Sequence, residues 1–344
     1  MRTQRAGRRR PAHSALVVAV ALLGIAGCSS GTELAVGEVD ATDAPAADGV
    51  DGHRVSVTVP TGRLDIVVAE PREEIGDQRA ADDGSLIRLT TSFRDAEVRT
   101  DVWAFAAREG NAEPVTLALE VGDERYDVGV VRRGADQDNE LAPDDAVVAV
   151  PDGVRLDDVR LLVGYDGLEQ AASAADGTRE PGPADTLYDG AERGPSANCA
   201  RGRFEPRVDP EFRCRVGEAR LLPYLPGPGW AEEGRGWLVV SLGTELTEVG
   251  AGDARYEVGS VANRTTYQGE SAAATFDERH DSVTYSAQLA FDVANGEAAD
   301  RQGLRVALDY RLSLTAGDPP AGGGPDRLRY VDDVTVPDPT PSQS

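Results

Sequence analysis

The residues best placed to bind a metal ion lie together in one acidic stretch. Asp136, Asp138 and Glu140 alternate along the chain there, and Asp144 and Asp145 follow closely. Several carboxylates at such spacing can supply oxygen ligands to a hard cation such as Ca²⁺. The stretch lacks the central glycine and the distant glutamate of an EF-hand loop, so a solvated acidic loop is the alternative. We expect no cofactor, with calcium at these five carboxylates as the open possibility.

Residues that catalyse reactions are scarce. All 35 basic residues are arginine, which removes lysine bases and Schiff-base chemistry. After residue 27 only His53 and His280 remain as histidines, and the second lies in a polar turn. Metalloprotease, nucleophile-elbow, P-loop and dinucleotide-binding motifs are absent from the sequence. We therefore predict a non-catalytic protein; the alternatives are an envelope hydrolase that uses a carboxylate pair and a calcium-stabilised spacer.

Trp230 lies in a stretch rich in proline and glycine, "PGPGWAEEG". An exposed tryptophan near carboxylates can stack on a sugar or anchor a partner, because aromatic side chains dominate the energetics of interfaces. The alternative is that Trp230 covers the end of a β-sandwich. We retain it as a candidate binding residue.

The first 27 residues have the features of an export signal. Five arginines precede the apolar run "ALVVAVALLGIAG", which is too short to span a bilayer, and Cys28 follows. The ending "IAGC" resembles the lipobox of bacterial lipoproteins. That resemblance implies that Cys28 is lipidated, becomes the first residue of the mature chain and anchors it to the membrane.

The charge of the chain limits its partners. Its formal charge is −25, and removal of the five arginines before Cys28 leaves 30 arginines against 60 acidic residues, a charge of −30. Such a protein repels nucleic acid, so we expect no nucleic-acid partner. We expect the protein on the extracytoplasmic face of the bacterial cell membrane, held by its lipid anchor, with an envelope protein or a glycan as its partner.

Cys199 and Cys214 are the two cysteines that remain after Cys28. An even pair in an oxidising compartment, with no histidine nearby, indicates a disulfide rather than a metal site. Closing a loop of about 15 residues stabilises a fold by about 3 kcal/mol in the chain-entropy model. We predict a structural disulfide.

Apolar residues alternate with polar ones along most of the chain. Leu304, Val306 and Leu308 share one side of their stretch, as do Val115, Leu117 and Leu119. Period-two alternation predicts antiparallel strands with one packed face, and the length of 344 residues predicts two domains. The expected order is a signal peptide (1–27), an acidic stalk (28–52), sandwich 1 (53–168), a linker (169–198), sandwich 2 with the disulfide (199–316), and a Gly/Pro linker with a short strand and tail (317–344).

Several phrases of the sequence occur twice. "GDERYDVG" at 122–129 returns as "GDARYEVG" at 252–259. "DDGSLIRLTTSF" corresponds to "EGRGWLVVSLGTEL", and "VVAVPDGVRLDDVRLLV" to "AFDVANGEAADRQGLRVAL", in the same order. The repeats predict two copies of one all-β unit, arranged as tandem antiparallel sandwiches.

The order of these segments resembles a known group. An aliphatic strand such as Trp237-Leu238-Val239-Val240, a Gly-Asp turn with a tyrosine strand, and an F-x-V-x-x-G strand are similar to the immunoglobulin-like domain of unknown function in bacterial surface lipoproteins. That family is related to a small secreted β-sandwich antigen. The resemblance implies two immunoglobulin-like sandwiches joined by a flexible linker, and a binding or scaffolding role at the cell envelope. It transfers no catalytic residue.

Overall fold

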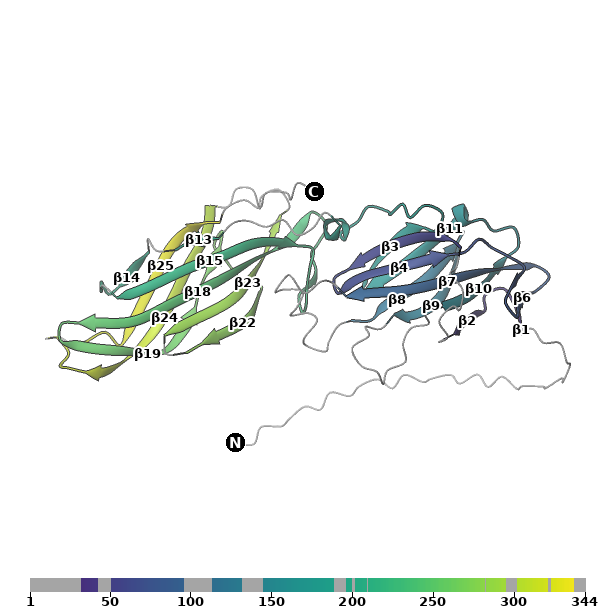
Figure 1. Ribbon diagram of the computed structural model, residues 1–344. Coiled ribbons are helices and arrows are strands. Elements are labelled where there is room, and N and C mark those ends of the chain that lie inside the picture. The colour runs from purple at the N-terminus through teal and green to yellow at the C-terminus, as the bar shows by residue number, and fades with distance from the viewer. Residues whose placement is uncertain are drawn as a thin grey trace, which may run out of the picture.

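The computed structural model describes residues 32–42, 51–95, 113–131, 145–188, 196–199, 202–208, 210–281, 283–294, 302–320 and 323–336. Its elements are β-strands, apart from the short 3₁₀ helices η1 (Leu156–Asp158) and η2 (Asp185–Leu187) (Figure 1). The predicted all-β class is confirmed. The expected signal peptide (1–27) and Cys28 lie outside the described residues.

Residues 32–188, which we call the first unit, contain two antiparallel sheets. One sheet has the strand order β2 (Val39–Thr42), β10 (Asp145–Pro151), β7 (Gly84–Asp95), β4 (Gly62–Val68) and β3 (His53–Val59). The other has the order β12 (Leu168–Ser173), β11 (Val159–Tyr165), β8 (Val115–Val121) and β9 (Glu124–Val131). A third, small sheet has the order β1 (Thr32–Leu34), β6 (Gln78–Ala80) and β5 (Glu74–Ile75).

The two main sheets of the first unit share one hydrophobic core. Leu64 and Ile66 of one sheet, with Leu119 and Leu161 of the other, are fully buried in the same cluster. Burying a side chain of this size contributes about 1.5–3 kcal/mol. Every second residue of each strand therefore faces the opposite sheet, as the alternation in the sequence predicts.

Residues 196–336, the second unit, also form two sheet layers, linked by one long strand. The first layer has the order β13 (Ala197–Asn198), β15 (Glu211–Leu222), β18 (Arg235–Ala251), β23 (Thr284–Ala294) and β22 (Ala274–His280). The second contains β19 (Ala254–Asn263), β24 (Gln302–Ala316), β25 (Arg327–Thr335), β14 (Arg203–Glu205), β20 (Thr266–Tyr267) and β21 (Glu270–Ser271). Strand β18 pairs with β15 and β23 in the first layer and, at its end, with β19 in the second.

The core of the second unit is rich in aromatic residues. Tyr285 and Phe291 from the first layer meet Tyr310 and Tyr330 from the second, and all four are almost fully buried. Burial raises the pKa of Tyr310 to about 12, so its hydroxyl remains a neutral hydrogen-bonding group at physiological pH.

The stalk expected at 28–52 is wrong for residues 32–42. Strand β2 pairs antiparallel with β10, and β1 pairs parallel with β6. Leu34 is buried with Leu86 and Ala149 on the outer side of the first sheet. The segment has few apolar residues, which suggested disorder, but the open edge of β10 satisfies its backbone and one leucine fills a small apolar site.

Residues 169–188, the larger part of the linker expected at 169–198, belong to the first unit. Strand β12 pairs with β11, and Ala172 and Ala174 are buried in the core of the first unit. Further on, the hydroxyl of Tyr188 accepts a hydrogen bond from the backbone N–H of Thr58 and donates one to Gln170. Composition misled here because small alanines are enough to pack an edge strand.

The second unit extends beyond residue 316, the boundary expected from sequence. Strand β25 pairs along its length with β24, and its Leu328 and Tyr330 are buried in the core. The short strand predicted in 317–344 is thus an integral strand of the second unit. Residues 337–344 lie outside the described residues.

The repeated eight-residue phrase has the same local structure in both units. Gly122 and Gly252 have φ of 61° and 64°, and Tyr126 and Tyr256 lie buried on the strands that follow. The sheet positions nevertheless differ. Among the described strands β9 pairs only with β8, whereas β19 pairs with both β18 and β24. The phrase therefore encodes a hairpin turn and a half-buried strand, not a fixed place in the sheet.

The other two repeated phrases occupy matching positions. Strand β7 lies between β4 and β10, as β18 lies between β15 and β23. Strands β10 and β23 are then followed by β11 and β24 in the opposite layers. These segments support the internal repeat that the sequence predicts.

Candidate functional site

Four of the five carboxylates proposed for calcium, Asp136, Asp138, Glu140 and Asp144, lie outside the described residues. The fifth, Asp145, begins β10 and is buried. Its Oδ1 accepts a hydrogen bond of 2.9 Å from Nε of Arg88. A carboxylate held in this way is a structural partner of Arg88. Within the described part of the chain, no three His, Cys, Asp or Glu residues gather as a metal site.

Cys199 and Cys214 form the predicted disulfide, with a Cα–Cα distance of 5.0 Å. The bond joins the segment after β13 to β15, and both cysteines are buried. The hydroxyl of Tyr330 donates a hydrogen bond to the carbonyl oxygen of Cys199, which connects the disulfide to β25 in the opposite layer.

Trp230 lies on the short hairpin β16 (Tyr224–Leu225) and β17 (Gly229–Trp230). Its indole N–H donates a hydrogen bond of 2.8 Å to the carbonyl oxygen of Tyr165 in the first unit. Its ring packs at 5.2 Å from Tyr224, which belongs to the core cluster of the first unit. Trp230 thus covers the end of the first sandwich, and its role toward an external partner stays a prediction.

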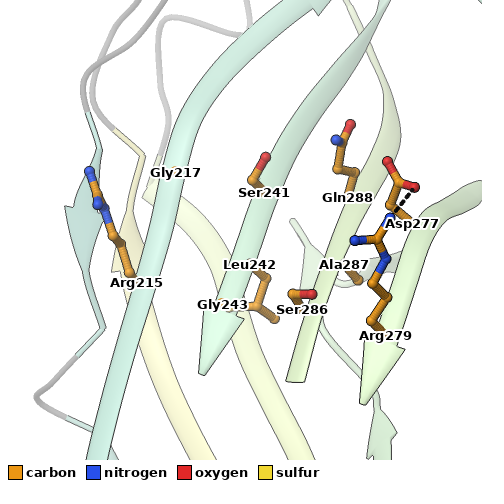
Figure 2. A pocket seen from close by; sticks show the side chains of 10 residues that line it. All are labelled: Arg215, Gly217, Ser241, Leu242, Gly243, Asp277, Arg279, Ser286, Ala287 and Gln288. Carbon is orange, nitrogen blue, oxygen red and sulfur yellow. Dashed lines mark ion pairs between the residues drawn. The ribbon is translucent and has the colours of Figure 1, made fainter. Parts of the chain in front are cut away.

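Two hollows on the second unit adjoin each other on the outer face of β15, β18, β23 and β22, and Figure 2 shows the residues that line the first of them. Their volumes are about 370 and 620 Å³. Both are lined by Arg215, Gly243 and Ser286, so we treat them as one groove, the outer groove. The residues between these, such as Leu242 and Ala287, face the core.

The register of the strands places two arginines on either side of a floor of small residues. Arg215 lies opposite Gly243, Gly243 opposite Ser286, and Ser286 opposite Arg279. Figure 2 shows Arg215 on one side, Arg279 on the other and the small residues between them. A Cβ atom built on Gly243 would meet nothing within 4 Å, so the missing side chain is part of the space of the groove.

Both outer strands of the groove are bulged. The pairing of β15 with β18 shifts between Val216 and Ala219, and that of β22 with β23 shifts between Phe276 and Arg279. Asp277, within the second bulge, has a φ of 48°, which is uncommon for a residue other than glycine. Bulges bend a strand and redirect its side chains, and they are frequent beside functional sites.

The charges of the groove are exposed and loosely paired. Arg279 lies 3.5 Å from Asp277, and Arg213 lies 3.2 Å from Glu245. The guanidinium of Arg215 donates a hydrogen bond of 3.1 Å to the hydroxyl of Ser196. No carboxylate of the described residues forms an ion pair with Arg215. Exposed ion pairs contribute about 0–1 kcal/mol, so these arginines can exchange their partners for a ligand.

None of the polar residues that line the outer groove is predicted from the sequence to form a site. The available signal was a second alternation on the polar side of the strands, with Ser241 and Gly243 on β18 and Ser286 and Gln288 on β23. Serine and glycine at alternate positions of two neighbouring strands indicate an outer sheet face with few bulky side chains. The arginines at 213 and 215, on either side of Cys214, add charge at its edge.

Comparisons with known proteins add no identity. No model of a known protein family matches the chain. A search of curated proteins finds no relative. Among the described residues, no helix is long and apolar enough to cross a membrane.

Proposed function

We propose that the protein is a lipid-anchored, extracytoplasmic lipoprotein that acts as a non-catalytic binding or scaffold module at the bacterial cell envelope. In this proposal residues 1–27 are the signal peptide, Cys28 is the lipidated residue, and the two units are tandem immunoglobulin-like sandwiches. The paired layers around each core and the matching places of β7 and β18 support that arrangement.

The outer groove is the observation that carries the binding role. It combines a smooth floor with hydrogen-bond donors on both sides, which suits the recognition of a polar ligand. Its lining carboxylates, Asp277 and Glu245, are paired with Arg279 and Arg213, so neither is a free base in the protein without ligand. A rigid sheet presents these groups in fixed positions, as a binding module requires.

The binding role can be tested by photo-crosslinking in intact cells. A photoreactive residue replaces Ser286 on the floor of the groove or, as a control, Ser313, which is exposed on β24 in the other layer. We expect crosslinked species from position 286 and far fewer from position 313. Equal labelling at the two positions, or turnover of an envelope substrate that is lost in Asp277→Asn, would overturn the proposal.

The anchor is tested separately. In wild-type cells fed an alkyne-bearing fatty acid we expect label on the mature protein that begins at Cys28, whereas Cys28→Ala removes the label and releases the protein from the membrane fraction. Retention of label in Cys28→Ala would contradict lipidation at this cysteine.

A further inference from the structure

We infer that the outer groove binds a linear polysaccharide whose sugars carry carboxylates, with Arg215 and Arg279 as the groups that hold those carboxylates. The inference rests on the proposed binding function and names its ligand class. The charge of the groove, the chemistry of its floor and the pairing of its strands support it.

Charge complementarity favours an anion. The chain as a whole carries a formal charge of −25, yet the groove has arginines along both sides. Arg279 and Arg213 already lie within ion-pair distance of carboxylates of the protein itself. A ligand carboxylate can replace these exposed partners directly, because guanidinium matches a carboxylate with two parallel hydrogen bonds. Arg215 is available in the same way from the opposite side.

The side chains on the floor of the groove suit a sugar ligand better than a peptide ligand. Ser241, Ser286 and Gln288 offer hydroxyl and amide groups, whereas protein partners are held by aromatic or aliphatic anchors in pockets. An added peptide strand cannot pair with the floor of the groove. Strand β18 is paired on both sides, with β15 and with β23, so its backbone groups are already used. A ligand here is recognised through side chains, which suits a molecule rich in hydroxyl groups.

The dimensions of the outer groove suit one extended polysaccharide chain that runs along the strands. The row from Arg215 to Arg279 crosses four strands, which separates their Cα atoms by about 14 Å. From Ser241 to Glu245 the floor extends about 14 Å along β18. In a β-1,4-linked chain successive sugars are turned by about half a turn, so their substituents point to alternate sides of the chain, where the arginines are.

The test compares β-1,4-linked oligoglucuronate with the cello-oligosaccharide of the same length, which differs only by having CH₂OH in place of the carboxylate. Binding to the full chain in detergent is measured by calorimetry. We expect oligoglucuronate to bind and the neutral oligosaccharide to bind at least tenfold more weakly. Arg215→Gln and Arg279→Gln should each weaken binding by roughly tenfold to a hundredfold, the loss expected for a charged hydrogen bond.

Two further variants keep the test specific. Arg203→Gln is the matched control, because Arg203 is as exposed as Arg279, at 76%, and also lies near a carboxylate two residues away, at 3.6 Å. It should bind like the wild type. Gly243→Val places a side chain into the floor at a position where a Cβ atom meets no neighbour within 4 Å, and it should abolish binding while leaving the melting temperature unchanged or raised.

The remaining outcomes decide against the ligand class. Equal affinity for the neutral oligosaccharide, or full binding by Gly243→Val, would overturn the inference. So would tighter binding of poly-glutamate or of polyglycerol phosphate through the same two arginines. Absence of oligoglucuronate binding together with crosslinks from position 286 refutes the acidic polysaccharide and leaves the proposed binding function intact. Absence of both refutes the function as well.

Discussion

The indole N–H of Trp230 donates a 2.8 Å hydrogen bond to the carbonyl oxygen of Tyr165, 65 residues earlier in the chain. Tyr224 packs edge-on against both rings, with centroids 5.3 Å from Tyr165 and 5.2 Å from Trp230. Burial, above all, raises the pKa of the Tyr224 hydroxyl, and the neighbouring Tyr165 and Asp166 add to this rise. A hairpin of the second unit thus completes the core of the first.

This contact predicts that the two units unfold together. Trp230→Phe keeps a ring and removes the N–H, and should lower the free energy of unfolding by about 1 kcal/mol. Trp230→Ala also removes apolar contact and should lower it by about 2 kcal/mol, less than the roughly 3–5 kcal/mol of a fully buried ring. Denaturant unfolding of the full chain followed by tryptophan fluorescence and far-ultraviolet circular dichroism measures both changes. Two separate transitions in the wild type would contradict the coupling.

Asp65 predicts a dependence of stability on pH. Burial works against ionisation of this carboxyl, but hydrogen bonds from Ser56, Arg94 and Arg63 outweigh it, so its pKa lies below the ordinary value of 3.8. A lowered pKa in the folded state adds stability above pH 3.8, and that stability is lost as the pH falls through the folded-state pKa. Asp65→Asn should therefore cost about 1–3 kcal/mol at pH 7 and progressively less below pH 4.

Urea unfolding of wild type and Asp65→Asn between pH 7 and pH 2.5 measures this difference. The matched control is Asp127→Asn, since Asp127 also accepts a hydrogen bond from an arginine, Arg125, but is 79% exposed. Its removal should change stability by less than about 1 kcal/mol. A constant effect of Asp65→Asn over the whole pH range would show that the loss is not electrostatic.

The strands of the cores could be predicted from sequence because each carries its own signal. Leu308, Tyr310 and Leu312 alternate with Asp309 and Arg311, and the structure buries all three apolar side chains. Cys199 and Cys214 were paired by elimination, which required no knowledge of the fold. Information of this kind is local, and a strand reveals it before its neighbours are known.

The groove and the first strands could not be predicted in the same way. The row from Arg215 to Arg279 exists only through the register of four strands, which joins residues far apart in the chain. Strand β2 owes its structure to the edge of β10, more than 100 residues later. The contact of Trp230 with Tyr165 is likewise a property of two folded units. In each case the deciding partner is distant, and no local pattern encodes it.

Removal of the disulfide should lower the stability of the protein and weaken ligand binding in the outer groove. Replacing both Cys199 and Cys214 by serine should lower the free energy of unfolding by about 3 kcal/mol, because the unfolded chain regains its freedom. Cys214 lies on β15 between Arg213 and Arg215, so loosening the strand should also weaken oligoglucuronate binding. Guanidinium unfolding measures the first effect, and a reducing agent should destabilise the wild type but not the double variant. Equal sensitivity of the two proteins to the reductant would contradict a structural role for the bond.

The two copies of the repeated phrase give a further prediction. In each copy a turn glycine precedes a strand, and the two strands have different neighbours. Gly122 and Gly252 have φ near +60°, a conformation that a residue with a Cβ adopts at a cost of about 1 kcal/mol. Neither glycine has an atom within 4 Å of the position of a Cβ, so Gly122→Ala and Gly252→Ala should each lower stability by that amount through the backbone alone. Gly243→Ala, at a glycine without positive φ, is the control and should leave stability unchanged or raise it. If both copies of the phrase serve only to form the turn, Gly122→Ala and Gly252→Ala should lower stability by the same amount, although β9 and β19 have different positions in their sheets. A large loss at Gly252 alone would instead mean that the phrase acts through its sheet neighbours.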